Sequence, residues 1–190
     1  MENIADKKRA ILESTLELIK ENGFHGTPMS LVAKKACVAA GTIYHYFDSK
    51  ETLIIELHSY VLNTMLAAIT KGDDAQKPYQ DRLTSIWMNH YQYYLNNPDV
   101  LQFLEQYTNS PYNTKHFNEL RCVPNTLKTF LRDGIEQGIL KPVPERLIGE
   151  MMHSTVSSVA KLSLTKQLDV NETVLGQAMQ ILWDGIKAHN

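Results

Sequence analysis

The sequence "ACVAAGTIYHYFDSK", residues 36–50, joins a run of small side chains to three aromatic residues and one histidine. At about 100° per residue, one side of a helix over residues 40–46 carries the inward-facing side chains, namely Ala40, Ile43, Tyr46 and Phe47. The other side presents Gly41, Thr42 and His45, with Tyr44 at its flank. Small side chains let the backbone approach DNA closely, and Thr, Tyr and His can bind phosphates or base edges. A tight turn before such a helix predicts a helix-turn-helix.

The segments on either side of this stretch also have helical spacing. A first helix is predicted over residues 6–21, with one apolar face made of Ile11, Leu12, Thr15, Leu16 and Ile19, and Asn22-Gly23 ends it. A second begins at Met29 or Ser30 and ends near Ala36, with the Thr27 hydroxyl predicted to accept backbone N–H bonds at its start. A fourth begins at Ser49 and turns Leu53, Ile54, Leu57, Val61 and Met65 inward.

The remainder of the chain predicts further helices and almost no strands. They cover about residues 81–96, 98–108, 114–121, 125–137, 144–167 and 171–189. The polar segment "TKGDDAQKPYQ", residues 70–80, marks the predicted domain boundary. We therefore expect an all-α protein of about nine helices: a three-helix domain over residues 1–50, a connecting helix over 49–69, and a helical bundle over 70–190.

Composition excludes several classes of protein. The 190 residues are 43% hydrophobic and 21% charged, which is ordinary for a globular chain, and no apolar run approaches the roughly 20 residues of a membrane span. The N-terminus lacks a signal-peptide core, so we expect a cytoplasmic protein without a membrane partner. The first 50 residues hold seven Lys/Arg against six Asp/Glu, a balance that neither favours nor excludes a nucleic-acid partner.

The region from about Lys8 to Ile54 resembles the N-terminal domain of TetR-family transcriptional regulators. The resemblance rests on ordered motifs, which are Gly23-Phe24, Thr27, Val32-Ala33, Gly41-Thr42-Ile43-Tyr44, Tyr46-Phe47 and Ser49-Lys50-Glu51. It implies a homodimer, an operator with two-fold symmetry, and a C-terminal domain whose ligand releases DNA. We accordingly expect a repressor that binds a palindromic operator.

The resemblance also implies a set of DNA-contacting positions. They are Thr27, Met29, Ser30, Ala39, Ala40, Thr42, Tyr44, His45 and Lys50. Tyr44 and Lys50 are expected to hold phosphates, with Thr42 and His45 nearest the bases. Ser30 stands where many members have a long polar residue, and Ala39-Ala40 replace more polar residues. More of the discrimination would then rest on backbone approach and DNA shape.

Other conspicuous residues favour simpler interpretations. His45 and His58 lack metal-ligand spacing, so no metal or cofactor is expected. The two cysteines, Cys37 and Cys122, have no metal-ligand spacing, and Cys37 is interpreted as a structural residue, with redox sensing as the weaker alternative. No catalytic motif is present, and an enzyme is not expected. Two alternatives remain: a helical protein–protein interaction module without DNA binding, and a small-molecule-binding carrier or enzyme that uses only the aromatic residues of the C-terminal region.

The C-terminal region holds a stripe of aromatic residues at helical spacing. Such a stripe is either core or the lining of a pocket for a mostly apolar or aromatic effector. The residues proposed to bind this effector are Trp87, His90, Tyr91, Tyr94, Phe103, Tyr107, Phe117 and Met152, with His153 as a further candidate.

The last two predicted helices carry apolar stripes that suit a four-helix dimer interface. One stripe is Ile148, Met151, Met152, Thr155, Val156 and Val159; the other is Val174, Ala178, Ile181, Leu182 and Gly185. One short recognition helix reads few base pairs, which independently favours a homodimer with two such helices.

Overall fold

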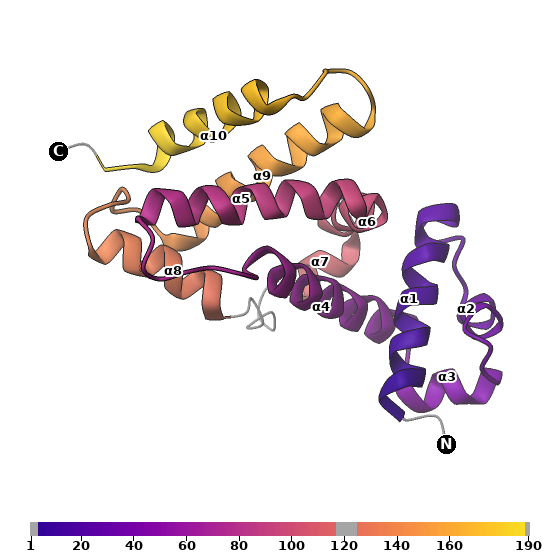
Figure 1. Ribbon diagram of the computed structural model, residues 1–190. Coiled ribbons are helices and arrows are strands. Elements are labelled where there is room, and N and C mark those ends of the chain that lie inside the picture. Colours follow the sequence, from indigo (N-terminus) through magenta and orange to yellow (C-terminus); the bar gives the residue numbers. More distant parts are fainter. Residues whose placement is uncertain (1–3, 117–124, 189–190) are drawn as a thin grey trace. The chain divides into compact units, whose positions relative to one another are not determined.

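The computed structural model describes residues 4–116 and 125–188. These residues form ten helices, where the sequence predicted about nine (Figure 1). Within the described ranges the only β-pairing is one isolated bridge between Leu140 and Lys187. The helices are α1 (Ile4–Asn22), α2 (Met29–Lys35), α3 (Ala40–Tyr46), α4 (Lys50–Ile69), α5 (Tyr79–Asn96), α6 (Pro98–Thr108), α7 (Pro111–His116), α8 (Asn125–Glu136), α9 (Glu145–Leu164) and α10 (Glu172–Ile186). The all-α prediction is confirmed.

Contacts group the helices into two compact units. The first unit contains α1, α2, α3, the beginning of α4, α6 and α7; the second contains the end of α4, α5, α8, α9 and α10. Among the described residues the chain passes between the units inside α4, after Leu62, and again after Pro98. The predicted division of functions near residue 70 stays a prediction.

In the first unit, α1 supplies the surface on which the helix-turn-helix is built. Ile11, Leu12, Thr15 and Ile19 are buried as predicted, but Leu18 is buried and Leu16 only partly so. The N–H of Gly23 donates to the carbonyl of Ile19 at 2.8 Å, with Gly23 in the left-handed region at φ +66°. This terminates α1 where the sequence predicted.

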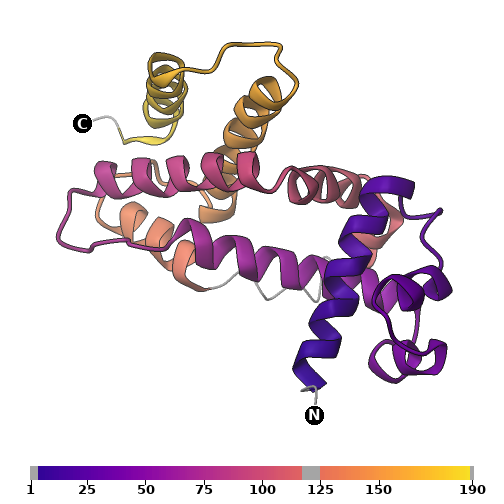
Figure 2. The ribbon, with the colours of Figure 1, turned by 45° about the vertical axis from the view of Figure 1, so that its right-hand side comes forward.

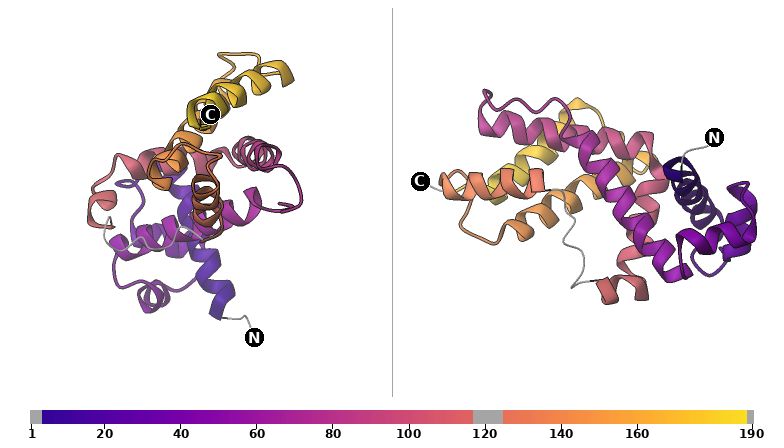
Figure 3. Two further views of the ribbon diagram at one scale, coloured as in Figure 1. Left: turned by 90° about the vertical axis from the view of Figure 1, so that its left-hand side faces the viewer. Right: turned by 90° about the horizontal axis from the view of Figure 1, so that it is seen from below.

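The helices α2 and α3 contact one another, and α2 also contacts α1 (Figure 3). Val32 and Ile43 are fully buried and form part of the shared core. The predicted cap at Thr27 is wrong: Pro28 is the N-cap of α2, without a side-chain hydrogen bond. The Thr27 hydroxyl instead donates to the carbonyl of Gly23 at 2.8 Å, because the tight α1–α2 turn brings these two groups together.

The turn between α2 and α3 depends on Cys37. Its φ is +54°, in the left-handed region that favours glycine, and its side chain is exposed. The N–H of the following Val38 donates to the carbonyl of Ala33 at 3.0 Å, which closes the end of α2. An L-residue in this conformation costs about 1–2 kcal/mol.

By length and composition, α4 is apolar enough to cross a membrane, the one such helix among the described residues. Its inward residues Leu53, Ile54 and Leu57 are fully buried, which is the behaviour of a core helix.

In the second unit, α9 packs on α5, α8 and α10 (Figure 2). The start of α5 is fixed to α8 because the rings of Tyr79 and Phe130 stack at 4.4 Å and the Tyr79 hydroxyl donates to the Phe130 carbonyl at 3.0 Å. Gly134 leaves room for that hydroxyl, since a Cβ there would lie 2.3 Å from it. The guanidinium of Arg82 lies over the Phe130 ring and binds both carboxylate oxygens of Asp73, at 2.8 and 2.7 Å.

Several helix boundaries in the structure differ from the predicted ones by a few residues. α5 begins at Tyr79 rather than residue 81, and α9 ends at Leu164 rather than 167. α7 covers Pro111–His116, whereas the helical segment predicted over 114–121 extends outside the described residues.

Replacing Cys37 by glycine should stabilise the protein. Glycine adopts the left-handed conformation without steric cost, although it loses more entropy on folding, so we expect a net gain of about 0.5–1 kcal/mol in the free energy of unfolding. Urea unfolding measures this gain. Cys37→Ala is the matched control, because it removes the thiol and keeps the strained conformation. Equal stabilities of the two variants would contradict the assignment of strain to Cys37.

Candidate DNA-binding face and effector site

The exposed face of α3 is made of small and hydrogen-bonding residues. Tyr44 is 55% exposed, and Ala39, Ala40, Gly41 and His45 are also exposed, while Thr42 is partly so. Ile43 and Phe47 are fully buried and orient the helix. Ala40, predicted to face inward, is exposed because it is the first residue of α3 and no earlier turn covers it.

Two of the predicted contact residues lie inside the unit. Thr27 is 2% exposed and Met29 is 8% exposed, so both side chains pack in the helix-turn-helix core. Ser30, next to Met29, is exposed. Burial therefore separates residues that hold the hairpin together from residues that stand on its surface.

Lys50 begins α4 and is tied to the α1–α2 turn. Its ammonium donates to the carbonyl of Phe24, and burial lowers the pKa of the Lys50 side chain. The hydroxyl of Ser49 accepts the N–H of Thr52 at 3.1 Å, which caps the start of α4. In this position the Lys50 ammonium orders the turn, and two of its three N–H donors stay available for a phosphate.

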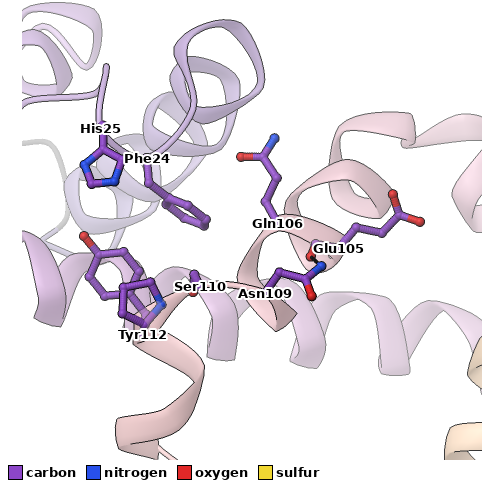
Figure 4. Close-up of a pocket in the computed structure, with 8 residues that line it drawn as sticks. Phe24, His25, Glu105, Gln106, Asn109, Ser110 and Tyr112 are labelled. Carbon is purple, nitrogen blue, oxygen red and sulfur yellow. Dashed lines mark hydrogen bonds between the residues drawn. The ribbon is translucent and has the colours of Figure 1, made fainter.

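The ring of Phe24 links the α1–α2 turn to α6 and α7. Its centroid lies 6.0 Å from that of Phe103 and 5.4 Å from that of Tyr112. Beside these rings is an open pocket of about 510 Å³, with the rings of Phe24, His25 and Tyr112 on one side and Glu105, Gln106 and Asn109 on the other (Figure 4). It is lined by Phe24, His25, Glu105, Gln106, Asn109, Ser110, Pro111 and Tyr112.

The proposed effector residues divide between the two units. Phe103 and Tyr107 belong to the first unit and are buried there; the Tyr107 ring stacks on His58 at 3.9 Å. Trp87, His90, Tyr91, Tyr94 and Met152 belong to the second unit and are buried as well. Phe117 lies outside the described residues.

In the second unit the polar ends of three α5 aromatic residues meet partners on α9. The Trp87 N–H donates to the Thr155 hydroxyl at 3.2 Å, and the Tyr91 hydroxyl donates to the Ser163 hydroxyl at 3.1 Å. The Tyr94 hydroxyl lies 3.2 Å from Nδ1 of His153. The sequence predicts Thr155 in a dimer stripe and gives no indication of a role for Ser163. Their eight-residue separation on one helix face is the signal that could have placed both opposite α5.

His90 differs from its neighbours on α5. It is 7% exposed, and its Nε2 has no hydrogen-bond partner among the described residues. Its ring lies 4.6 Å from that of Tyr94 and 5.7 Å from that of His153. Burial, helped by the neighbouring His153, lowers the pKa of His90 from 6.5 to about 3, so the ring is neutral at physiological pH.

The buried neutral His90 predicts a specific dependence of stability on pH. Below its ordinary pKa of 6.5 and above about 3, the unfolded chain binds a proton at residue 90 that the folded chain does not. As pH is lowered through this window, the free energy of unfolding should therefore decrease, by up to about 1.4 kcal/mol per pH unit from this group. Urea unfolding of wild type and His90→Phe across the window isolates the effect. The advantage of the variant should grow as pH falls; a constant difference would contradict the buried neutral state.

Comparisons with known proteins agree with this architecture. Residues 11–57 match the family model described as bacterial regulatory proteins of the tetR family, and residues 78–187 match the tetracyclin repressor-like C-terminal domain. An HTH-type transcriptional regulator of Haemophilus influenzae is 26% identical over 184 residues, which are 96% of each chain.

Solved structures share the fold. A TetR family regulator of Shewanella sp. PV-4 has a TM-score of 0.84 at 24% identity, over 96% of this chain and 99% of that one. FadR of Bacillus subtilis, solved in complex with stearoyl-CoA, has a TM-score of 0.75 at 23% identity, over 94% and 98%. These relatives are regulators and not enzymes, as the sequence predicted. The two matched domains, in order and over most of the chain, show that it belongs to the TetR family of transcriptional regulators and carries their DNA-binding helix-turn-helix.

Proposed function

We propose that the protein is a cytoplasmic repressor that binds a palindromic operator as a homodimer and is released by a mostly apolar or aromatic small molecule. The observation that carries the DNA-binding part is the exposed face of α3, where Tyr44 and His45 project beside the small residues Ala39 to Gly41. The chain offers few long side chains there, so backbone approach and DNA shape would contribute much of the discrimination.

The DNA-contacting surface follows from exposure. We assign it to Ser30, Ala39, Ala40, Thr42, Tyr44, His45 and Lys50, whose ammonium has N–H donors beyond the one that the Phe24 carbonyl accepts. The buried Thr27 and Met29 would act through the position of α2.

The homodimer is supported by apolar side chains that α9 and α10 leave exposed. The predicted stripes divide: Ile148, Met152 and Val156 are buried within the protomer, whereas Met151 is 40% and Ile181 71% exposed. Leu147 is 50% exposed one turn before Met151. Met151 lies near Gly185, since a Cβ there would be 3.9 Å from the Met151 methyl group. The exposed face therefore continues from α9 to α10, where a second copy would cover it.

The effector class is supported by the buried aromatic face of α5. The stearoyl-CoA bound to the Bacillus subtilis relative carries a long apolar chain, which agrees with an apolar effector here. At that level of identity the relative informs the class of ligand and not its identity.

The contacts of Phe24 suggest how release would occur. Because its ring packs on Phe103 and Tyr112, a shift of α6 would move the α1–α2 turn. The carbonyl of Phe24 also accepts a hydrogen bond from the Lys50 ammonium, so the start of α4 would move with the turn. An effector would thus change the spacing of the two recognition helices in the dimer.

Selection from random duplex DNA tests the DNA-binding proposal. Wild type should enrich a two-fold symmetric motif, and its affinity for that motif should fall steeply with salt because phosphate contacts release counterions. Tyr44→Ala should weaken binding about tenfold without loss of stability, because the side chain is more than half exposed. Its matched control is Tyr93→Phe on α5. A folded protein that enriches no motif at low salt would support the helical interaction module instead.

Sedimentation equilibrium tests the dimer. Ile181→Glu should place two charges in the proposed interface and weaken dimerisation at least tenfold, while the helical content of each protomer stays unchanged. Gln80→Glu, on the exposed side of α5, adds the same charge outside the proposed interface and should leave the dimer intact. Equal dimerisation of the two variants would exclude this face.

A further inference from the structure

Four residues with polar ring atoms or hydroxyls line the buried face of α5, and one of them differs from the rest. Trp87, Tyr91 and Tyr94 place their polar ends against α9 within hydrogen-bond distance. His90 lies between them in sequence, is also buried at 7% exposure, and leaves Nε2 without a hydrogen-bond partner among the described residues. A buried polar atom without a hydrogen-bond partner destabilises a fold. The neighbouring polar groups of α5 all have such partners, so the unpaired Nε2 indicates a hydrogen-bond partner supplied by a bound ligand.

The surroundings of His90 provide hydrogen-bonding groups but little positive charge. His153 and Tyr94 stand 5.7 and 4.6 Å away, measured between ring centroids. The Ser157 hydroxyl donates to the His153 carbonyl at 2.5 Å and lies 3.5 Å from the His153 ring. The cluster thus combines two imidazoles and two hydroxyls within an aromatic environment.

The basic side chains of the neighbouring helices are engaged elsewhere. Arg82 of α5 binds Asp73, and Arg146 and Lys161 of α9 are exposed. On α8, Lys128 and Arg132 pair with Glu145. Burial keeps His90 itself neutral by lowering its pKa. An anionic group placed beside His90 would therefore lose its hydration without meeting a cation.

We infer that the effector carries an uncharged hydroxyl on its apolar or aromatic body, and that this hydroxyl forms a hydrogen bond with Nε2 of His90 between α5 and α9. The inference rests on the proposed effector function and adds to it the chemical class of the ligand. A hydroxyl both donates and accepts, so it satisfies Nε2 whichever ring nitrogen of His90 carries the proton. The aromatic face of α5 would then bind the body of the ligand, with Met152 as the adaptable apolar side chain.

Three probes of similar size separate the possible chemistries: phenol, toluene and benzoate. Phenol and toluene differ only in a hydroxyl against a methyl group, and benzoate supplies an anion. Equilibrium dialysis of the protein measures each affinity for wild type, for His90→Phe and for Tyr93→Phe. Tyr93→Phe is the matched control because it removes a hydroxyl from α5 outside the His90 cluster.

The ratio of phenol to toluene affinity is the decisive quantity. This ratio should fall about tenfold in His90→Phe, because a phenyl ring fills the place of the imidazole but offers no hydrogen-bond partner. It should stay unchanged in Tyr93→Phe. In wild type, phenol and not toluene should shift the ¹⁵N resonance of His90 Nε2. Unfolding midpoints of both variants establish that they are folded.

Three other outcomes would overturn the inference, and they differ in what else they exclude. Toluene binding with an unchanged phenol-to-toluene ratio in His90→Phe would remove the hydroxyl inference and leave the apolar effector site intact. Benzoate binding tighter than phenol would show that the site takes an anion. If neither phenol nor toluene binds to wild type, the proposed effector site on α5 and α9 fails, and the inference fails with it.

Discussion

The first unit depends on the burial of Ile43 and Phe47. A seven-residue helix is too short to be stable alone, since isolated helices below about 12–15 residues are marginal in water. These two side chains are fully buried, and the Lys8 ammonium lies 5.5 Å from the centroid of the Phe47 ring. Because the large apolar groups of α3 point inward, its outer face is left with small and hydrogen-bonding residues. The anchoring of the helix and the character of its exposed face therefore have the same origin.

The α1–α2 turn connects this helix-turn-helix to the rest of its unit. The Phe24 ring packs on α6 and α7, and the backbone carbonyl of Phe24 accepts a hydrogen bond from the ammonium of Lys50 in α4. One residue of an irregular segment thus contacts three helices. A displacement of any of these helices would therefore act on the turn.

The core of the second unit differs from that of the first, because it buries aromatic side chains that carry polar groups. Three aromatic residues of α5 are partnered by hydroxyls or a ring nitrogen of α9, so their burial costs no hydrogen bonds. Tyr79 is partnered in the same way by the Phe130 carbonyl. His90 is left as the polar group whose Nε2 the described fold does not satisfy.

The sequence alone predicted the all-α fold, nearly every helix and the family, because these follow from local periodicity, turn residues and ordered motifs. It also predicted the inward faces of α1 and α4 closely, with Leu18 in place of Leu16 as the main difference. Only the tertiary structure decided that the Thr27 hydroxyl bonds the end of α1, that Lys50 holds the Phe24 carbonyl, and that Phe103 and Tyr107 belong to the first unit. It also decided that Thr155 partners Trp87. Each of these facts joins residues distant in sequence or within a tight turn. Periodicity indicates which side of a helix is buried, but it does not identify the group of another segment that a buried side chain contacts.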